Sequence, residues 1–177
     1  MEQNHIGFAG LTIKTIVVHT VTYFAMGFAA SSLLSYSSRF ASAEMACWMR
    51  PTSDPIVMAG PLFQPIRGLV FAAVIYPLHE ILLGKKNGWL ILWWTLVGLG
   101  ILSTFGPPPG SIEGLIYTRI PVLNQLTGWL EVVPQAFLLS IILYYWANHP
   151  EKRWLDWVLG AAFVIAMLLP VLGLLVR

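Results

Sequence analysis

The chain has 177 residues, of which 57% are hydrophobic and only 10% are charged. Soluble domains carry about 25% charged residues, so a water-facing globular surface is excluded. The low charge also excludes a disordered chain, and a single cysteine excludes a disulfide framework. A formal net charge of +2 gives no reason to expect a nucleic-acid partner. The composition therefore indicates an integral membrane protein whose main partner is the lipid bilayer.

Five apolar runs predict membrane-spanning helices, since a helix needs about 20 apolar residues to cross the hydrocarbon core. None of the runs alternates as the strand of a membrane barrel would. We therefore predict one all-α, polytopic membrane domain over residues 1–177, a bundle of five transmembrane helices. The predicted spans are residues 11–34, 66–83, 89–105, 129–147 and 154–176. Pro77 and Pro170 fall inside two of these spans and predict a kink or an early end in each.

The connections between the spans differ in length and in charge. Long connections, residues 35–65 and 106–128, lie on one side, and short ones, residues 84–88 and 148–153, lie on the other. All four lysines belong to the side of the N-terminus and the short connections, which is typical of a cytoplasmic face. We therefore expect a cell membrane, such as the bacterial inner membrane, with the N-terminus in the cytoplasm and the long connections outside.

The third connection contains an apolar segment, residues 111–126, that is too broken to span. Ser111 is suited to cap a helix, and Glu113 would lie in its first turn, where the helix dipole favours a carboxylate. Pro121 then interrupts the run. The segment predicts a short helix that is either interfacial or re-entrant.

The two long connections contain related sequences, residues 60–71 and 106–117. Gly, Pro, Ile, Gly and Leu recur at five matching positions, and the single charged position is Arg67 in one copy and Glu113 in the other. Arg67 opposes the dipole of the helix that it begins, so it needs an acidic partner or an anionic ligand. Gly-Pro turns can also resemble one another by chance. Our hypothesis is that the two loops face each other and that Arg67 and Glu113 form a partly buried ion pair.

Glu131 competes with Glu113 as the partner of Arg67. Glu131 shares a face of the fourth span with Gln135, and Gln64 lies three residues before Arg67. Polar groups at membrane depth are costly, which makes each of them a candidate for ligand binding. The alternative is a salt bridge that only holds the loops against the bundle.

A rigid loop before the second span carries two opposite charges, Arg50 and Asp54. Because Asp54 precedes a proline, it favours a turn in which its side chain accepts a backbone hydrogen bond. The alternative is that Arg50 and Asp54 close over the Arg67 group and help to bind a ligand.

A polar stripe follows helical spacing along the first span and includes Thr12, Thr15, His19 and Thr22. Such a stripe must face other helices, where its members either form interhelical hydrogen bonds or contribute to a binding site. A haem held by His19 and His79 is an alternative for which the sequence offers no other support, so no cofactor is predicted. No metal-ligand motif is present either.

The sequence leaves three functions open and does not decide whether the protein is an enzyme. The first is binding or transport of a small ion, an anionic head group or a lipid at an outward-facing Arg/Glu cluster. The chain would then act as a homo-oligomer or as a subunit of a larger membrane complex. The second is a membrane enzyme for a lipid or lipid-linked substrate, with Glu113 or Glu131 as acid/base and Arg67 as anion clamp. The third is a haem- or quinone-binding membrane subunit.

Overall fold

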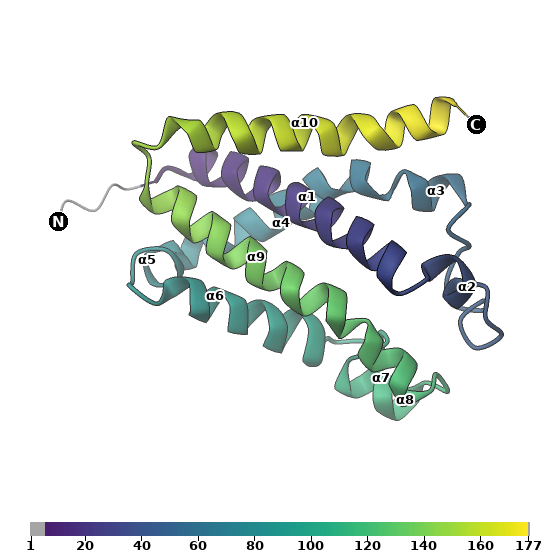
Figure 1. Ribbon diagram of the computed structural model, residues 1–177. Helices are drawn as coiled ribbons and strands as arrows, with labels where there is room; N and C mark the ends of the chain where they lie inside the picture. The colour runs from purple at the N-terminus through teal and green to yellow at the C-terminus, as the bar shows by residue number, and fades with distance from the viewer. Residues whose placement is uncertain (1–5, 177) are drawn as a thin grey trace.

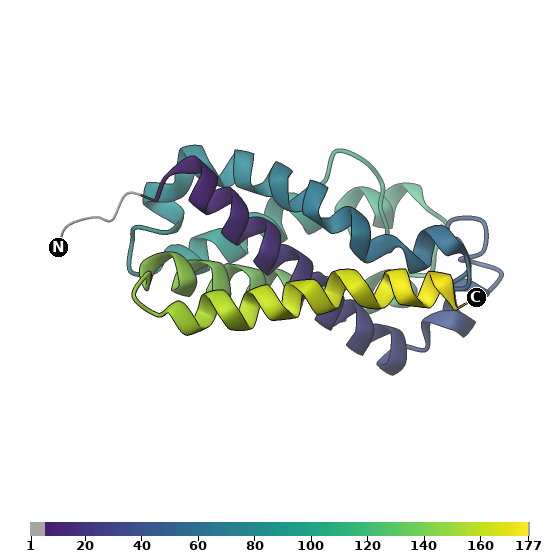
Figure 2. The same cartoon turned by 90° about the horizontal axis from the view of Figure 1, so that it is seen from above.

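A computed structural model describes residues 6–176, and every regular element in that range is a helix. The elements form an elongated bundle in two perpendicular views (Figures 1 and 2). Four segments are long and apolar enough to cross a membrane: Phe8–Leu33, Gly60–Leu82, Val122–Asn148 and Arg153–Leu175. The all-helical class is therefore confirmed, and four of the five predicted spans are found at their expected places.

Helix α1 (Phe8–Leu33) is the central element and contacts α4 (Gln64–Ile75), α9 (Trp129–Asn148) and α10 (Arg153–Leu175). Its closest neighbour is α4, where a Cβ placed on Gly68 would lie 2.7 Å from the Ile16 Cα. The two backbones can approach this closely only because residue 68 has no side chain.

The second span is a helix assembled from short pieces. It begins with the 3₁₀ turn η1 (Gly60–Phe63), which follows the short helix α3 (Pro55–Met58) and leads into α4. A second 3₁₀ turn, η2 (Tyr76–Leu78), then separates α4 from α5 (His79–Leu82). The proline at position 77 lies inside η2, so the predicted interruption is confirmed and follows from the missing backbone donor.

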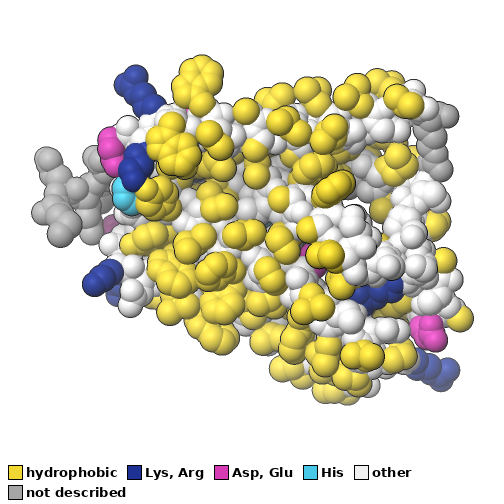
Figure 3. All heavy atoms as spheres, in the orientation of Figure 1, with side chains coloured by type: hydrophobic (Ala, Val, Ile, Leu, Met, Phe, Trp, Pro, Cys, Tyr) yellow, Lys and Arg dark blue, Asp and Glu magenta, His cyan; other side chains and the backbone are white. Residues whose placement is uncertain are grey.

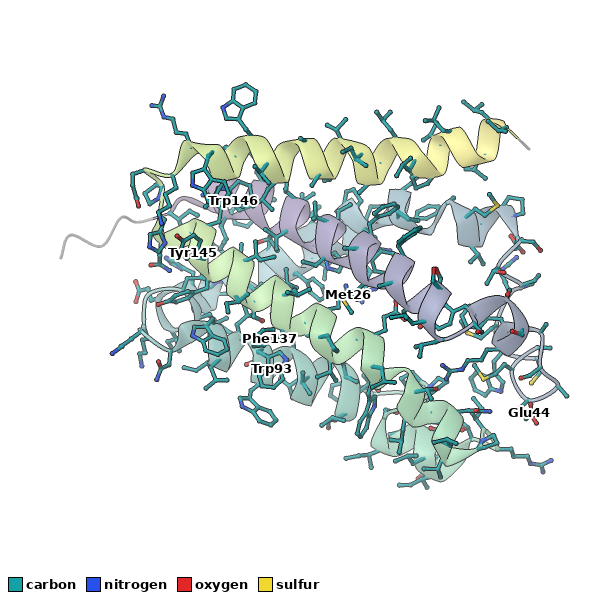
Figure 4. The ribbon with its side chains drawn as sticks, viewed as in Figure 1. Met26, Glu44, Trp93, Phe137, Tyr145 and Trp146 are labelled. Atoms are coloured by element: carbon teal, nitrogen blue, oxygen red, sulfur yellow. The ribbon has the colours of Figure 1, made fainter. Side chains whose placement is uncertain are left out.

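The third predicted span is shorter than expected. Helix α6 (Gly88–Val97) continues into a π-helical turn, η3 (Gly98–Leu102), and then ends. Fifteen helical residues rise about 22 Å, less than the roughly 30 Å of a hydrocarbon core. The helix packs on α9, where the rings of Trp93 and Phe137 point toward each other with centroids 5.6 Å apart (Figure 4). Within residues 6–176, four full-length spans are found, and the third of the five predicted spans is not confirmed as one of them.

The third connection folds into two short helices, α7 (Ile112–Tyr117) and α8 (Val122–Thr127), directly before α9. The Ser111 hydroxyl accepts a hydrogen bond from the Gly114 backbone N–H at 2.9 Å, which confirms the predicted cap. Helix α10 continues past Pro170 to Leu175, so the early end that was one of the two expected effects of Pro170 does not occur.

The two ends of the bundle differ in content. Helices α2 (Tyr36–Phe40), α3, α7 and α8 gather at one end, as expected for the two long connections, and the short connections lie at the other (Figure 1). The face shown in Figure 3 is largely hydrophobic across its middle, with most of its charged side chains toward the two ends. The short-connection half holds an apolar core that includes Leu11, Val18, Ile75, Leu82, Leu92, Leu139, Leu143 and Trp146.

Candidate functional site

Arg67 does not form the ion pair that the sequence predicted. Within residues 6–176 its guanidinium pairs with neither Glu113 nor Glu131, and instead lies over the Phe71 ring, 5.7 Å from the centroid. Both Arg67 and Glu113 are exposed. Glu113 lies in the first turn of α7, in the position predicted for it. Among the described residues, the cluster expected around Arg67 is therefore not formed, and that prediction is wrong.

The orientation of α4 explains this outcome. Its buried face carries Gln64, Gly68, Ala72 and Ile75, which pack toward α1. Arg67 lies about a quarter of a turn away from the centre of that face. The depth of a residue can be read from a sequence, but the direction in which a helix turns its side chains depends on its neighbours.

A cavity of about 800 Å³ lies instead at the long-connection end, between α1, α2, α8 and α9. We call it the α2 cavity. Its apolar wall includes Tyr23, Phe24, Phe28, Phe40, Met45 and Trp48. Its charged and hydroxyl groups include Tyr36, Arg39, Arg50 and Glu131. Of the residues predicted to bind a ligand, Arg50 and Glu131 therefore line this cavity.

Glu131 is held in the α2 cavity by a tyrosine. The Tyr36 hydroxyl donates a hydrogen bond to Oε2 of Glu131, which joins α2 to the first turn of α9. Burial, together with this hydrogen bond, raises the pKa of the Tyr36 phenol above its ordinary value. The phenol therefore stays a donor at neutral pH. A carboxylate can accept several hydrogen bonds, so a single neutral donor leaves Glu131 with unused capacity.

Arg39 is the second charged group in the α2 cavity. Its Nη2 donates to the backbone carbonyl of Asn124 on α8, while its Nε is buried and has no hydrogen-bond partner. Arg39 is close enough to Glu131 for their charges to interact, yet the two do not form an ion pair. Opposite charges therefore line one cavity, and each is held by a neutral partner from another element.

Arg50 and Asp54 form the ion pair found in the described part of the chain, with Nη1 and Oδ2 3.0 Å apart. The other Asp54 oxygen accepts a hydrogen bond from the backbone N–H of Ile56 and caps α3. The predicted turn is therefore confirmed. The same ion pair gives Arg50 an acidic partner at the cavity wall.

His19 and Gln64 meet between α1 and α4, and neither lines the α2 cavity. The Gln64 amide nitrogen donates to the Gly60 carbonyl at 3.0 Å, so its oxygen faces His19 Nε2 at 3.1 Å, and His19 is the donor. His19 Nδ1 is buried without a partner. Thr15, His19 and Thr22 are all buried, which confirms that the polar stripe faces other helices.

The remaining predicted groups lie apart from one another. His79 engages the Tyr76 carbonyl at 2.6 Å through Nδ1 and stacks on the Tyr76 ring, so His19 and His79 have separate partners. Gln135 is half-buried on α9. Among residues 6–176, no group of three or more His, Cys, Asp or Glu side chains is placed to hold a metal ion.

Tyr36 and Arg39 were missed by sequence reasoning. Both lie in a part of the long connection, residues 36–40, that matches no chemical motif, and their partners Glu131 and Asn124 follow more than 80 residues later. The available signal was local: a tyrosine and an arginine three residues apart can share one side of a helical turn directly beyond an apolar span.

The assembled site offers a guanidinium, a carboxylate and aromatic rings in one partly apolar cavity. Such a combination is suited to an amphipathic ligand with a charged group. Comparison with known proteins finds no family model, no curated protein and no solved structure that matches the chain. Any functional proposal therefore depends on the geometry of the site.

Proposed function

We propose that the chain is an integral membrane protein that binds an amphiphile with an anionic head group in the α2 cavity. The observation that carries this proposal is Arg39, a cavity-lining guanidinium without an ion pair in the described chain and with a buried, unpartnered Nε. Arginine is suited to bidentate recognition of phosphate and carboxylate groups. The volume is typical of a small-molecule site, and the aromatic and methionine wall is suited to the apolar part of the ligand.

The proposed setting is a cell membrane, with a bacterial inner membrane as the first system to examine. The N-terminus and the lysine-bearing short connections would face the cytoplasm, so the α2 cavity would open on the opposite side. The four apolar helices support the membrane part of the proposal.

Binding is favoured over passage through the bundle. The α2 cavity occupies the long-connection end, while the other half is filled by the apolar core around Leu11, Leu139 and Leu143. The buried hydroxyls of Thr15 and Ser140 in this half donate to carbonyls of their own helices, whereas a transport pathway would need polar groups that are free to contact the cargo.

The proposal can be tested by native mass spectrometry of the protein in mild detergent. We expect retention of added phosphatidylglycerol and little retention of diacylglycerol with the same acyl chains. Arg39→Gln should weaken phosphatidylglycerol binding about tenfold or more, since a hydrogen bond to a charged group contributes about 1.5–3 kcal/mol. Arg119→Gln is the matched control, because Arg119 is exposed at the same end and does not line the α2 cavity. Equal binding by wild type and Arg39→Gln would contradict the proposal.

Catalysis on a lipid or lipid-linked substrate is a second candidate. It is favoured by Glu131, which lines the α2 cavity and keeps free acceptor capacity beside the Tyr36 hydroxyl. Glu131 would act as the acid/base and Arg39 would hold the anion. Incubation with a total lipid extract, followed by mass spectrometry, should then reveal a product that Glu131→Gln does not form. If folded protein that binds the ligand left every lipid in the extract unchanged, this candidate would be removed.

A further inference from the structure

Two opposite charges, Arg39 and Glu131, line the α2 cavity without forming an ion pair with each other. The Arg39 guanidinium is held by the Asn124 carbonyl, and the Glu131 carboxylate is held by the Tyr36 hydroxyl. Tyr36 and Arg39 both belong to α2, whereas Asn124 and Glu131 belong to α8 and α9. The hydrogen bonds from α2 to α8 and α9 therefore give each of the two cavity-lining charges a neutral partner.

The charge balance of the α2 cavity restricts what it can bind. Arg50 already has Asp54 as its partner, which leaves one positive and one negative group, Arg39 and Glu131, for a ligand. A ligand with only an anionic group would engage Arg39, whose charge otherwise acts on Glu131, and would place its own negative charge near that carboxylate. A partly buried carboxylate without a cation is costly, so a ligand that supplies both signs is complementary to this site.

We infer that the preferred ligand is a zwitterion, with a phosphate or similar anion at Arg39 and an ammonium group at Glu131. This inference rests on the proposed function and specifies its ligand class. Aromatic rings lining the same cavity, from Tyr23, Phe28 and Trp48, would favour the ammonium through cation–π interactions. Phosphoethanolamine is the simplest head group with both charges.

The test compares two ligands that differ only in the ammonium charge. Phosphatidylethanolamine and its N-acetyl derivative share the phosphate and the acyl chains, but acetylation removes the positive charge. We expect the unmodified protein in detergent to bind phosphatidylethanolamine roughly tenfold more tightly than the N-acetyl form. Equal affinities would overturn the inference. If Arg39→Gln still weakened both ligands, the proposed function would stand, whereas binding of neither ligand would remove both.

Two variants test whether Glu131 causes the preference for phosphatidylethanolamine. Glu131→Gln should bind both lipids with similar affinity, whereas the control Glu113→Gln, which changes an exposed carboxylate outside the cavity, should keep the roughly tenfold preference. A preference that persists in folded Glu131→Gln would contradict the assigned role. Since the ligand comparison uses the unmodified protein, it remains decisive even if Glu131→Gln does not fold.

Water-soluble glycerophosphoethanolamine distinguishes the source of the zwitterion. Displacement of phosphatidylethanolamine by this compound at similar concentration would support the zwitterion and identify a soluble ligand. Displacement only by compounds with acyl chains would support the zwitterion as a lipid head group. Displacement by glycerophosphoglycerol just as well as by glycerophosphoethanolamine would overturn the inference.

Discussion

At the scale of single residues, the buried polar groups of this protein differ in how fully they are satisfied. The His19 ring donates a hydrogen bond to the Gln64 side-chain oxygen, and the Gln64 amide nitrogen donates to the Gly60 carbonyl. These two hydrogen bonds connect α1, α4 and η1. His19 is 1% exposed and Gln64 is 5% exposed, which means that water cannot replace a lost partner. The pair therefore affects stability mainly because removing one member would leave the other as a buried polar group without a hydrogen bond.

Replacement of Gln64 by Leu should lower the free energy of unfolding by about 1–3 kcal/mol, because the His19 N–H would lose its acceptor inside the bundle. The double variant His19→Phe/Gln64→Leu should recover part of this loss, since both polar groups are then removed. Thermal unfolding in detergent measures both effects. If the loss of stability in the double variant equalled the sum of the losses in Gln64→Leu and His19→Phe alone, the two residues would not be a coupled pair.

At the scale of elements, close helix contacts and ordered turns decide where the cavity walls lie. The approach of α1 and α4 depends on Gly68, and the fold of α7 and α8 depends on Gln125. The Gln125 side chain is buried, accepts from the Gly110 N–H and donates to the Ile120 carbonyl and the Thr118 hydroxyl. A single amide thus connects the loop before α7 with the turn after it.

Gly68→Ala should destabilise the protein by about 1–3 kcal/mol, because the new methyl group would lie 2.7 Å from the Ile16 Cα and α4 would have to move. Gly160→Ala provides the matched control. A Cβ at that position of α10 meets no atom within 4 Å, so no loss is expected. Thermal unfolding of the two variants side by side is the measurement, and equal stability of Gly68→Ala and Gly160→Ala would contradict the close approach.

Gln125→Ala should loosen the α7–α8 segment before it affects the rest of the bundle. Arg119 is exposed between these helices and provides a trypsin site. We expect cleavage after Arg119 to accelerate about tenfold or more, since buried backbone groups at Gly110 and Ile120 would lose their partner. Gln135→Ala is the control, because that half-buried glutamine has no side-chain hydrogen bond among the described residues. Unchanged cleavage in Gln125→Ala would show that other contacts order the segment.

At the scale of the whole molecule, the long connections, the α2 cavity and Cys47 share one end of the bundle. Glu44, three residues before Cys47, lies in the loop after α2, far from Tyr145 and Trp146 at the other end (Figure 4). Cys47 is exposed and is the single cysteine of the chain. The protein therefore carries a natural reporter for the side on which the cavity opens.

A membrane-impermeant maleimide should label Cys47 in intact cells if the long connections lie outside, as proposed. Cys47→Ser should abolish the signal. In the double variant Cys47→Ser/Asn87→Cys, the new thiol lies in a short connection and should be labelled only after permeabilisation. The reverse pattern would place the α2 cavity on the cytoplasmic side and contradict the proposed orientation.

The sequence by itself determined the helical class, the positions of four apolar spans and the local signals at their ends. These properties depend on neighbours in the chain: the hydrophobicity of Phe8–Leu33, the cap at Ser111 and the proline at 77 act over a few residues. Local signals did not predict where helices continue or end when packing against other helices determines it. Pro170 is accommodated in α10, and α6 with η3 ends before the third predicted span does.

The tertiary structure alone decided which charges meet. Arg67 was expected to meet one of two carboxylates, but the packing of Gly68 against Ile16 directs the buried face of α4 elsewhere. Glu131 instead accepts a hydrogen bond from Tyr36, and Arg39 lines the same cavity from a part of the long connection that lies outside the related sequences. The physical reason is that a helix's rotation about its axis is set by the neighbours against which it packs. Contacts between residues far apart in the chain depend on that rotation.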